Sequence, residues 1–144
     1  MSLLYFNSQK SNRIVEGSGI GLLYLDCIKS AYARIETFFS VAQLIGRLRK
    51  SHYDIIGAVL IVSSISELIE LIQNQELLED IPIVLILPVN DPEMNSLGYG
   101  LSPRYLTSVD HNDGEIREVL VQFVQKLKDQ FHDVIYRRAY QTDE

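Results

Sequence analysis

The chain has 144 residues, 47% of them hydrophobic, and carries a formal net charge of −6. This length predicts a single domain, residues 1–144, with one core of ordinary size. An acidic chain disfavours nucleic acid, which needs a basic surface, and it also disfavours anionic membranes. No apolar run is long enough to span a membrane, and Cys27, the only cysteine, excludes a disulfide within the chain. These features predict a cytoplasmic protein.

Apolar runs in the first half of the chain predict three strands. The third run has no polar residue, which is typical of a strand covered on both faces in a parallel sheet. Between the second and third strands, Val41, Leu44, Ile45 and Leu48 recur at helical spacing and predict a helix. The three predicted strands are residues 3–6, 33–38 and 55–62.

Residues 10–32 are harder to assign. An alternating fold requires a helix there, but Gly17, Gly19 and Gly21 fall inside it. Each glycine in a helix interior costs about 1 kcal/mol relative to Ala. The helix could begin late, near Gly19, or residues 21–26 could form an extra strand.

The second half of the chain continues the alternation. Ser63, Ser64 and Ser66 supply hydroxyls that could cap a helix, and Glu67 follows near its positive end. Apolar residues mark that helix as far as Leu78. Beyond it, the pattern predicts a strand at residues 81–87, a turn or helix start at 90–93 and a short strand at 104–107. A long helix at 113–139 and a frayed tail at 140–144 follow.

Strands that alternate with helices predict an α/β fold with a parallel sheet and right-handed crossovers. Five strands in this length fit a flavodoxin-like, doubly wound sheet. In such sheets ligands bind at the carboxyl ends of the strands, so the side chains there form a candidate site. They are neutral and mostly polar in this chain: Asn7, Ser8, Ser63, Ser64, Pro88, Asn90 and Ser108.

Two segments resemble a known family. Residues 81–88, which end in Leu87-Pro88, are similar to the fourth strand of bacterial response-regulator receiver domains. Residues 105–110 are similar to the fifth strand of the same family. The order of elements resembles that family over nearly the whole chain. The resemblance implies a flavodoxin-like signalling domain of two-component type.

Receivers of this kind use acidic residues that this chain lacks at the matching positions. The two acids that hold Mg²⁺ match Asn7 and Ser8, whose neutral oxygens are poorer ligands for a hard cation. The aspartate that accepts phosphate matches the stretch ending in Val62 and Ser63, where there is no carboxylate to form an acyl phosphate.

Two further positions depart from the receiver pattern. The hydroxyl and the lysine that stabilise the transferring phosphoryl group match Leu87 and Ser108. Tyr105 falls where receivers place an aromatic residue that moves between buried and exposed positions, although a half-buried strand aromatic is the simpler interpretation. The resemblance therefore implies a pseudo-receiver that cannot be phosphorylated, and we predict no catalytic residue, no metal and no cofactor.

Other chemistry has weaker support in the sequence. The serines at 63–66 have no histidine at a motif spacing, so they fit a helix cap better than a nucleophile. The glycines at 17–21 lack the spacing and the lysine of phosphate-binding loops. Asp26 would accept phosphate only if the strand register differed, and Cys27 beside it fits a small core residue.

The last predicted helix is longer than one domain can cover. Its apolar pattern runs from Ile116 to Ile135, about 30 Å at 1.5 Å per residue. Phe131, Val134 and Ile135 would therefore lie beyond the sheet, where a second copy of the chain could bury them. We predict a homodimer, with a linker helix to a further domain as the alternative.

Three functional hypotheses follow. The first, which the resemblance implies, is a signalling or docking module that is not an enzyme and that recognises a protein partner through its fourth helix, fifth strand and fifth helix. The second is a divergent flavodoxin-like protein or enzyme that binds a nucleotide or flavin at the strand ends. The third is a structural subunit of an assembly. The predicted interaction surface comprises Tyr105, Phe131, Val134 and Ile135.

Overall fold

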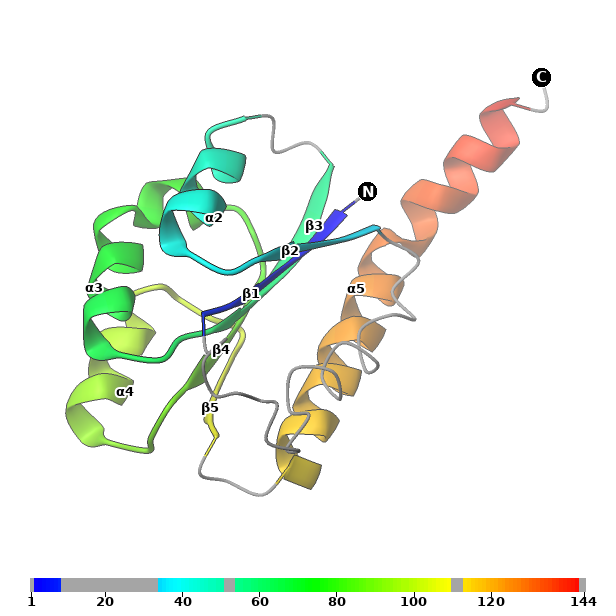
Figure 1. The fold of residues 1–144 in the computed structure, drawn as a ribbon. Helices are drawn as coiled ribbons and strands as arrows, with labels where there is room; N and C mark the ends of the chain where they lie inside the picture. Colours follow the sequence, from blue (N-terminus) through cyan, green and yellow to red (C-terminus); the bar gives the residue numbers. More distant parts are fainter. Residues whose placement is uncertain (1, 9–33, 51–53, 110–112, 143–144) are drawn as a thin grey trace.

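The computed structural model describes residues 2–8, 34–50, 54–109 and 113–142, and the side chains of all of these except 113 and 131–142. Five strands in this part of the chain form one parallel sheet in the order β2-β1-β3-β4-β5 (Figure 1). The predicted flavodoxin-like fold is confirmed. The strands are β1 (Ser2–Asn7), β2 (Arg34–Phe38), β3 (Ile55–Ile61), β4 (Ile83–Leu87) and β5 (Tyr105–Ser108).

The helices cover both faces of this sheet. Three α-helices and a short 3-10 helix, η4, lie on one face, and the long last helix lies on the other (Figure 1). No helix in the described ranges is long and apolar enough to cross a membrane. The helices are α2 (Val41–Leu48), α3 (Ile65–Gln73), η4 (Gln75–Leu78), α4 (Pro92–Tyr99) and α5 (Asp113–Thr142).

Several predictions fall outside the described residues. They include the first helix within 10–32, its alternative strand at 21–26, and the candidate residues Asp26 and Cys27. The other predicted elements are found within one residue of their predicted ends, apart from three larger differences at a helix, a strand and the C-terminus.

The first difference is that the helix predicted to continue to Leu78 is broken. The helix α3 ends at Gln73, and Asn74 donates from its side-chain Nδ2 to the Glu70 carbonyl at 2.9 Å. An amide that bonds the last carbonyls in this way competes with the next turn of helix. Residues 75–78 form the separate η4 instead.

The other two differences concern boundaries. The strand β4 begins at Ile83 rather than at residue 81, because Pro82 has no N–H to donate to the ladder; its carbonyl accepts from Ala58 instead. The helix α5 continues to Thr142 and so includes residues 140–142, which the sequence assigned to a frayed tail.

Two apolar layers form the core, one on each face of the sheet. Alternate residues of β1, β3 and β4 point into one layer under α2, α3 and α4 and into the other under α5. Every residue of β3 and β4 is buried, as the unbroken apolar runs predict for strands covered on both faces. The residues at the centre of these strands are fully buried: Val59, Leu60, Ile61, Val84, Leu85 and Ile86.

The strand β3 has an irregular register and a glycine against which α5 packs. Ser2 pairs with Ile55 but Leu3 pairs with Gly57, so β3 carries one extra residue opposite β1. A Cβ at Gly57 would lie 3.0 Å from Phe123 Cζ and 3.2 Å from Leu127 Cδ1. The missing side chain is therefore what allows α5 to pack against β3 here.

Each of the three α-helices on the α2–α4 face begins shortly after a strand and is capped by a side chain. Ser40 Oγ accepts from the Gln43 N–H at 3.2 Å, and Asp91 Oδ2 accepts from the Met94 N–H at 3.0 Å. Ser64 caps α3, as the serines at 63–66 predict. These caps fix where the chain turns at the carboxyl ends of β2, β3 and β4.

Candidate functional site at the carboxyl ends of the strands

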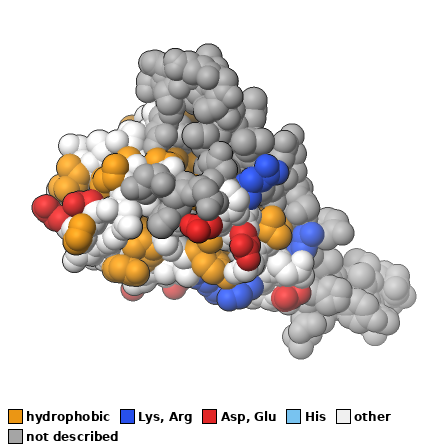
Figure 2. Space-filling view, turned by 90° about the horizontal axis from the view of Figure 1, so that it is seen from below, with side chains coloured by type: hydrophobic (Ala, Val, Ile, Leu, Met, Phe, Trp, Pro, Cys, Tyr) orange, Lys and Arg blue, Asp and Glu red, His pale blue; other side chains and the backbone are white. Residues whose placement is uncertain are grey.

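The parallel register brings the predicted site positions to one edge of the sheet. Asn7 pairs with Ile61, Ile61 with Ile86, and Leu87 with Ser108. Figure 2 shows the side of the molecule on which α5 begins. Most of the described side chains there are hydrophobic or neutral, and the acidic and basic side chains are scattered among them. The positions gathered at the carboxyl edge are Asn7, Ser8, Val62, Ser63, Leu87 and Ser108.

A carboxylate from α3 occupies the ends of β1 and β3. Glu67 Oε1 lies 2.5 Å from Ser8 Oγ and 3.0 Å from Ser63 Oγ, and it accepts from the Ser63 N–H at 2.8 Å. The two hydroxyl oxygens are themselves 3.0 Å apart. The Ser8 and Ser63 hydroxyls each have one proton, and each can donate it to the Glu67 carboxylate. Glu67 therefore ties the two strand ends together.

Sequence reasoning missed this role of Glu67. The spacing from Ser64 to Glu67 is a capping signal, and the Glu67 N–H does donate to Ser64 Oγ at 3.3 Å. The same spacing does not reveal that the carboxylate reaches Ser8, which is 59 residues away in the chain. A helix cap was thus predicted correctly, while a contact between strands was not.

Asn7 is buried at this edge. Only 8% of its surface is exposed, and its side chain makes a hydrogen bond with Tyr5. Burial raises the pKa of Tyr5 to about 12, and this hydrogen bond opposes the rise. Tyr5 therefore stays protonated at neutral pH and keeps the Asn7 side chain engaged. Within the described ranges, no group of three or more His, Cys, Asp or Glu residues could hold a metal ion.

Val62, Leu87 and Ser108 lie under the surface of the edge. Val62 and Leu87 have no exposed surface, and both belong to the apolar layer under α2, α3 and α4. Ser108 is 2% exposed. A Cβ at Gly98 of α4 would lie 3.7 Å from Leu87 Cδ1, so α4 lies directly over the end of β4. Leu87 and Val62 thus present apolar packing where a ligand would need polar atoms.

Tyr105 is held against α5. Its ring meets the Phe123 ring edge-on, with centroids 6.4 Å apart, and Lys126 Nζ lies 5.3 Å from its centroid. The Tyr105 hydroxyl is buried and has no hydrogen-bond partner. The structure thus places Tyr105 in the half-buried position of a strand aromatic. The side chains of Phe131, Val134 and Ile135 lie outside the description, although the backbone of α5 runs through them.

Comparisons with known proteins find similarity in fold alone. No protein-family model matches the sequence, and no curated protein matches it. A CheY-like response regulator receiver domain protein of Methanospirillum hungatei superposes with a TM-score of 0.63 at 7% identity, over 90% of this chain and 97% of that one. A receiver protein of Pseudoalteromonas atlantica gives 0.59 at 15% identity, over 90% and 98%.

A third solved structure with this fold is described as pilus assembly-related. That Burkholderia pseudomallei protein superposes with a TM-score of 0.61 at 11% identity, over 87% of this chain and 90% of that one. The similarity to receiver structures therefore extends over most of each chain. It establishes that the predicted receiver-type, flavodoxin-like fold is present.

Proposed function

We propose that this protein is a cytoplasmic pseudo-receiver, a signalling module that cannot be phosphorylated and that acts by docking a protein partner. The observation that carries the proposal is the bonding of Glu67 to Ser8 and Ser63 at the strand ends. Phosphoryl transfer to a carboxylate needs a free acceptor, a cation and donors that neutralise the developing charge.

The surrounding residues supply little of that machinery. Asn7 is engaged with Tyr5, and Val62 and Leu87 are buried apolar side chains. Glu67 is a carboxylate, but three donors already surround one of its oxygens. On this proposal the chain has no catalytic residue and no cofactor, and it is not an enzyme.

Support for docking comes from the β5 edge of the sheet. Tyr99 of α4 is 65% exposed and Val121 of α5 is 55% exposed, and these two helices pack on either side of β5. Large exposed apolar side chains next to a sheet edge favour contact with another protein. The proposed partner surface is therefore α4, β5 and the first half of α5.

The test is exposure to acetyl phosphate and Mg²⁺ followed by intact mass measurement. We expect no change in mass, while an active receiver domain in a parallel reaction gains one phosphoryl group. A stable gain of one phosphoryl group that is lost in Glu67→Gln, or in a variant of any aspartate, would overturn the proposal.

A structural subunit of an assembly is the second candidate. The similarity in fold to the pilus assembly-related protein favours it. Sedimentation separates the two candidates, because an assembly subunit should form species larger than a dimer as its concentration rises. A docking module should keep one mass over the same range.

A further inference from the structure

The helix α3 exposes two isoleucines and a carboxylate on its outer side. Ile65 and Ile69 are 39% and 41% exposed, and they lie one helical turn apart. Glu70, which follows Ile69, is exposed as well. Adjacent exposed apolar side chains mark a contact surface more often than isolated ones do. The outer side of α3 therefore offers apolar area to another molecule.

The helix α4 extends this surface. The strands β3 and β4 are parallel neighbours, and α3 and α4 begin shortly after them and contact each other. The two helices therefore run side by side in the same direction (Figure 1). Val89, which precedes α4, is 48% exposed, and Glu93 in its first turn is exposed. The first turns of both helices thus present apolar and acidic side chains at one edge of the sheet.

A hollow lies at the other end of α4, beside η4. It has a volume of about 220 Å³, and Glu76 of η4 and Leu101 after α4 are among the residues that line it. Glu76 is exposed, so the surface is also acidic at this end. Glu79 lines the same hollow, but it lines a second one with Arg104. Of these two carboxylates, only Glu76 is therefore counted as part of the acidic surface.

The charge on this surface has one sign. The sequence has no Lys or Arg between Lys50 and Arg104, a stretch that contains α3, η4 and α4. Glu70, Glu76 and Glu93 are exposed, and none of the three forms an ion pair with a residue that the structure describes. Lys50 follows α2, which contacts η4, and Arg104 precedes β5, so these cations lie at the borders of the stretch.

These features favour one kind of partner. The helices α2, α3 and α4 cover this face of the sheet, so an occupant packs against helices and does not extend the sheet. A helix with an apolar stripe fits such a face, because its ridges pack into the grooves of α3 and α4. Lys and Arg beside the stripe complement the carboxylates. A second copy that presented the same surface would bring like charges together, and anionic membranes and nucleic acids would be repelled.

We propose that the surface formed by α3, η4 and the start of α4 binds a basic amphipathic helix of a protein partner. The apolar stripe of that helix covers Ile65 and Ile69, and its Lys and Arg side chains lie near the carboxylates. This inference rests on the proposed function in taking a protein as the partner, and it adds the chemical class of that partner and a second surface. The α3–α4 surface comprises Ile65, Ile69, Glu70, Glu76 and Glu93.

The experiment is selection from a display library of amphipathic helices about 18 residues long, or five turns. Each helix keeps an apolar stripe of Leu and Ile, and its other positions are drawn equally from Lys, Glu, Gln and Ser. We expect the selected helices to be enriched in Lys over Glu beside the stripe. In an NMR titration, a selected helix should shift the backbone amide signals of α3, η4 and the start of α4.

Two variants of exposed residues test the two parts of the surface. Ile69→Gln should weaken binding of the selected helix by about tenfold, because it removes apolar area from the contact. Glu70→Lys should weaken binding by about threefold or more, and more strongly at low salt. Val121→Gln and Glu118→Lys are the matched controls, since they make the same changes at exposed positions of α5, and they should leave binding unchanged. All four variants should remain folded by circular dichroism.

Several results would overturn the inference. They are the enrichment of no helix, the enrichment of Glu over Lys, and an Ile69→Gln variant that binds as tightly as the parent chain. A change of sedimentation mass in Ile69→Gln would also overturn it, because a second copy would then cover this surface. Shifts confined to β5 and α5 would overturn it while the proposed function remained, whereas phosphorylation of the chain would remove the proposed function instead.

Discussion

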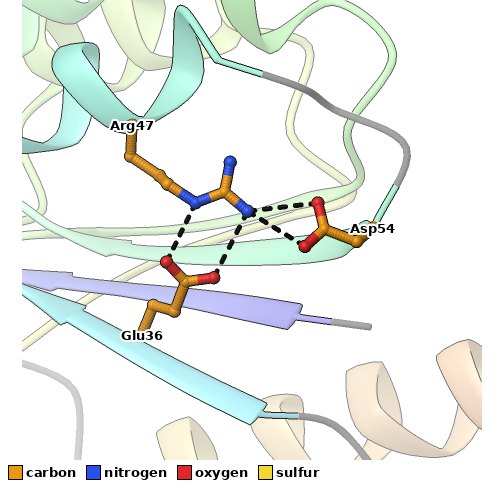
Figure 3. A network of polar contacts seen from close by, with 3 residues as sticks. All are labelled: Glu36, Arg47 and Asp54. Atoms are coloured by element: carbon orange, nitrogen blue, oxygen red, sulfur yellow. Dashed lines mark hydrogen bonds and ion pairs between the residues drawn. The ribbon is translucent and has the colours of Figure 1, made fainter.

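Arg47 joins three elements through one guanidinium group. It spans Glu36 on β2 and Asp54 just before β3, and it comes from α2 (Figure 3). The side chains of Arg47 and Glu36 are 14% and 23% exposed, so solvent screens this pair less than a typical surface pair. The hydrogen bond from Arg47 lowers the pKa of Glu36 below its usual 4.5. The same group thus connects α2 to β2 and to the start of β3.

We expect Arg47→Leu to lower the free energy of unfolding by about 1 kcal/mol at pH 7. A carboxyl group whose pKa is lowered on folding stabilises the fold above its unfolded pKa, and this stabilisation is lost as pH falls through its folded pKa. The difference between Arg47→Leu and the parent chain should therefore shrink below about pH 4.5. Urea unfolding at pH 7 and pH 3 measures it. Arg49→Leu, an exposed neighbour, should have little effect; an equal effect would contradict the prediction.

Glu67 gives the second prediction for a single residue. Replacing it with Ala removes the acceptor shared by Ser8 and Ser63, and should cost about 1 kcal/mol. Thermal unfolding measures the loss. Glu70→Ala is the control, because Glu70 is exposed on the same helix. Equal melting temperatures for the two variants would show that the bonds to Glu67 add no stability.

Glu67 and Arg47 also show which contacts the sequence could predict and which it could not. Hydroxyls before an apolar helix predict a cap, because a cap joins residues three or four positions apart. The contacts from Glu67 to Ser8 and from Arg47 to Glu36 depend on how strands and helices are placed in space. No local pattern encodes that placement, so these contacts were missed.

Two glycines in different elements have opposite roles. Gly57 lies in β3 under α5, where a Cβ would lie 3.0 Å from Phe123 Cζ. Gly46 lies in α2, where a Cβ would meet nothing within 4 Å. One glycine is needed for packing between a strand and a helix, while the other weakens its helix without any packing benefit.

Alanine at each position should therefore change stability in opposite directions. Gly57→Ala should lower the free energy of unfolding by about 1–3 kcal/mol, because the added methyl group overpacks the layer under α5. Gly46→Ala should raise it by up to about 1 kcal/mol, because alanine favours the helix. Urea unfolding of the two variants and the parent chain tests both. A destabilising Gly46→Ala would show that this face of α2 is more tightly packed than the structure indicates.

At the scale of elements, the bounds of strands were predicted best where an apolar run is long. The apolar runs of β3 and β4 gave their strands to within two residues, because burial on both faces leaves no place for a polar side chain. The break at Asn74 was missed because apolar residues continue past it into η4. The extra residue in β3 was missed because it concerns pairing with β1.

At the scale of the whole molecule, α5 is much longer than the sheet that it covers. Its 30 residues span about 45 Å. The longest of the described strands has seven residues, or about 23 Å. Figure 1 shows the last turns of α5 projecting past the sheet. Leu127 is the last buried residue among the α5 side chains that the structure describes, and the apolar pattern continues in the sequence at Phe131, Val134 and Ile135.

This pattern has the spacing of a coiled coil. Leu120, Val124, Leu127, Phe131 and Val134 are separated by alternating steps of four and three residues. The first three residues are buried against the sheet. A second copy of α5 is the simplest partner for the last two, so we infer that the chain forms a homodimer through residues 131–135.

The dimer is testable by sedimentation at micromolar concentration, where the parent chain should have twice its monomer mass of 16.4 kDa. Val134→Glu combined with Ile135→Glu should give a monomer that remains folded, because like charges on a shared face are costly to desolvate. Val121→Glu is the control, since it adds a glutamate to an exposed position on the same helix, and it should stay dimeric. A parent chain that sediments as a monomer at high concentration would rule out the dimer. The pseudo-receiver proposal would survive that result, because it depends on the carboxyl ends of the strands and not on the end of α5.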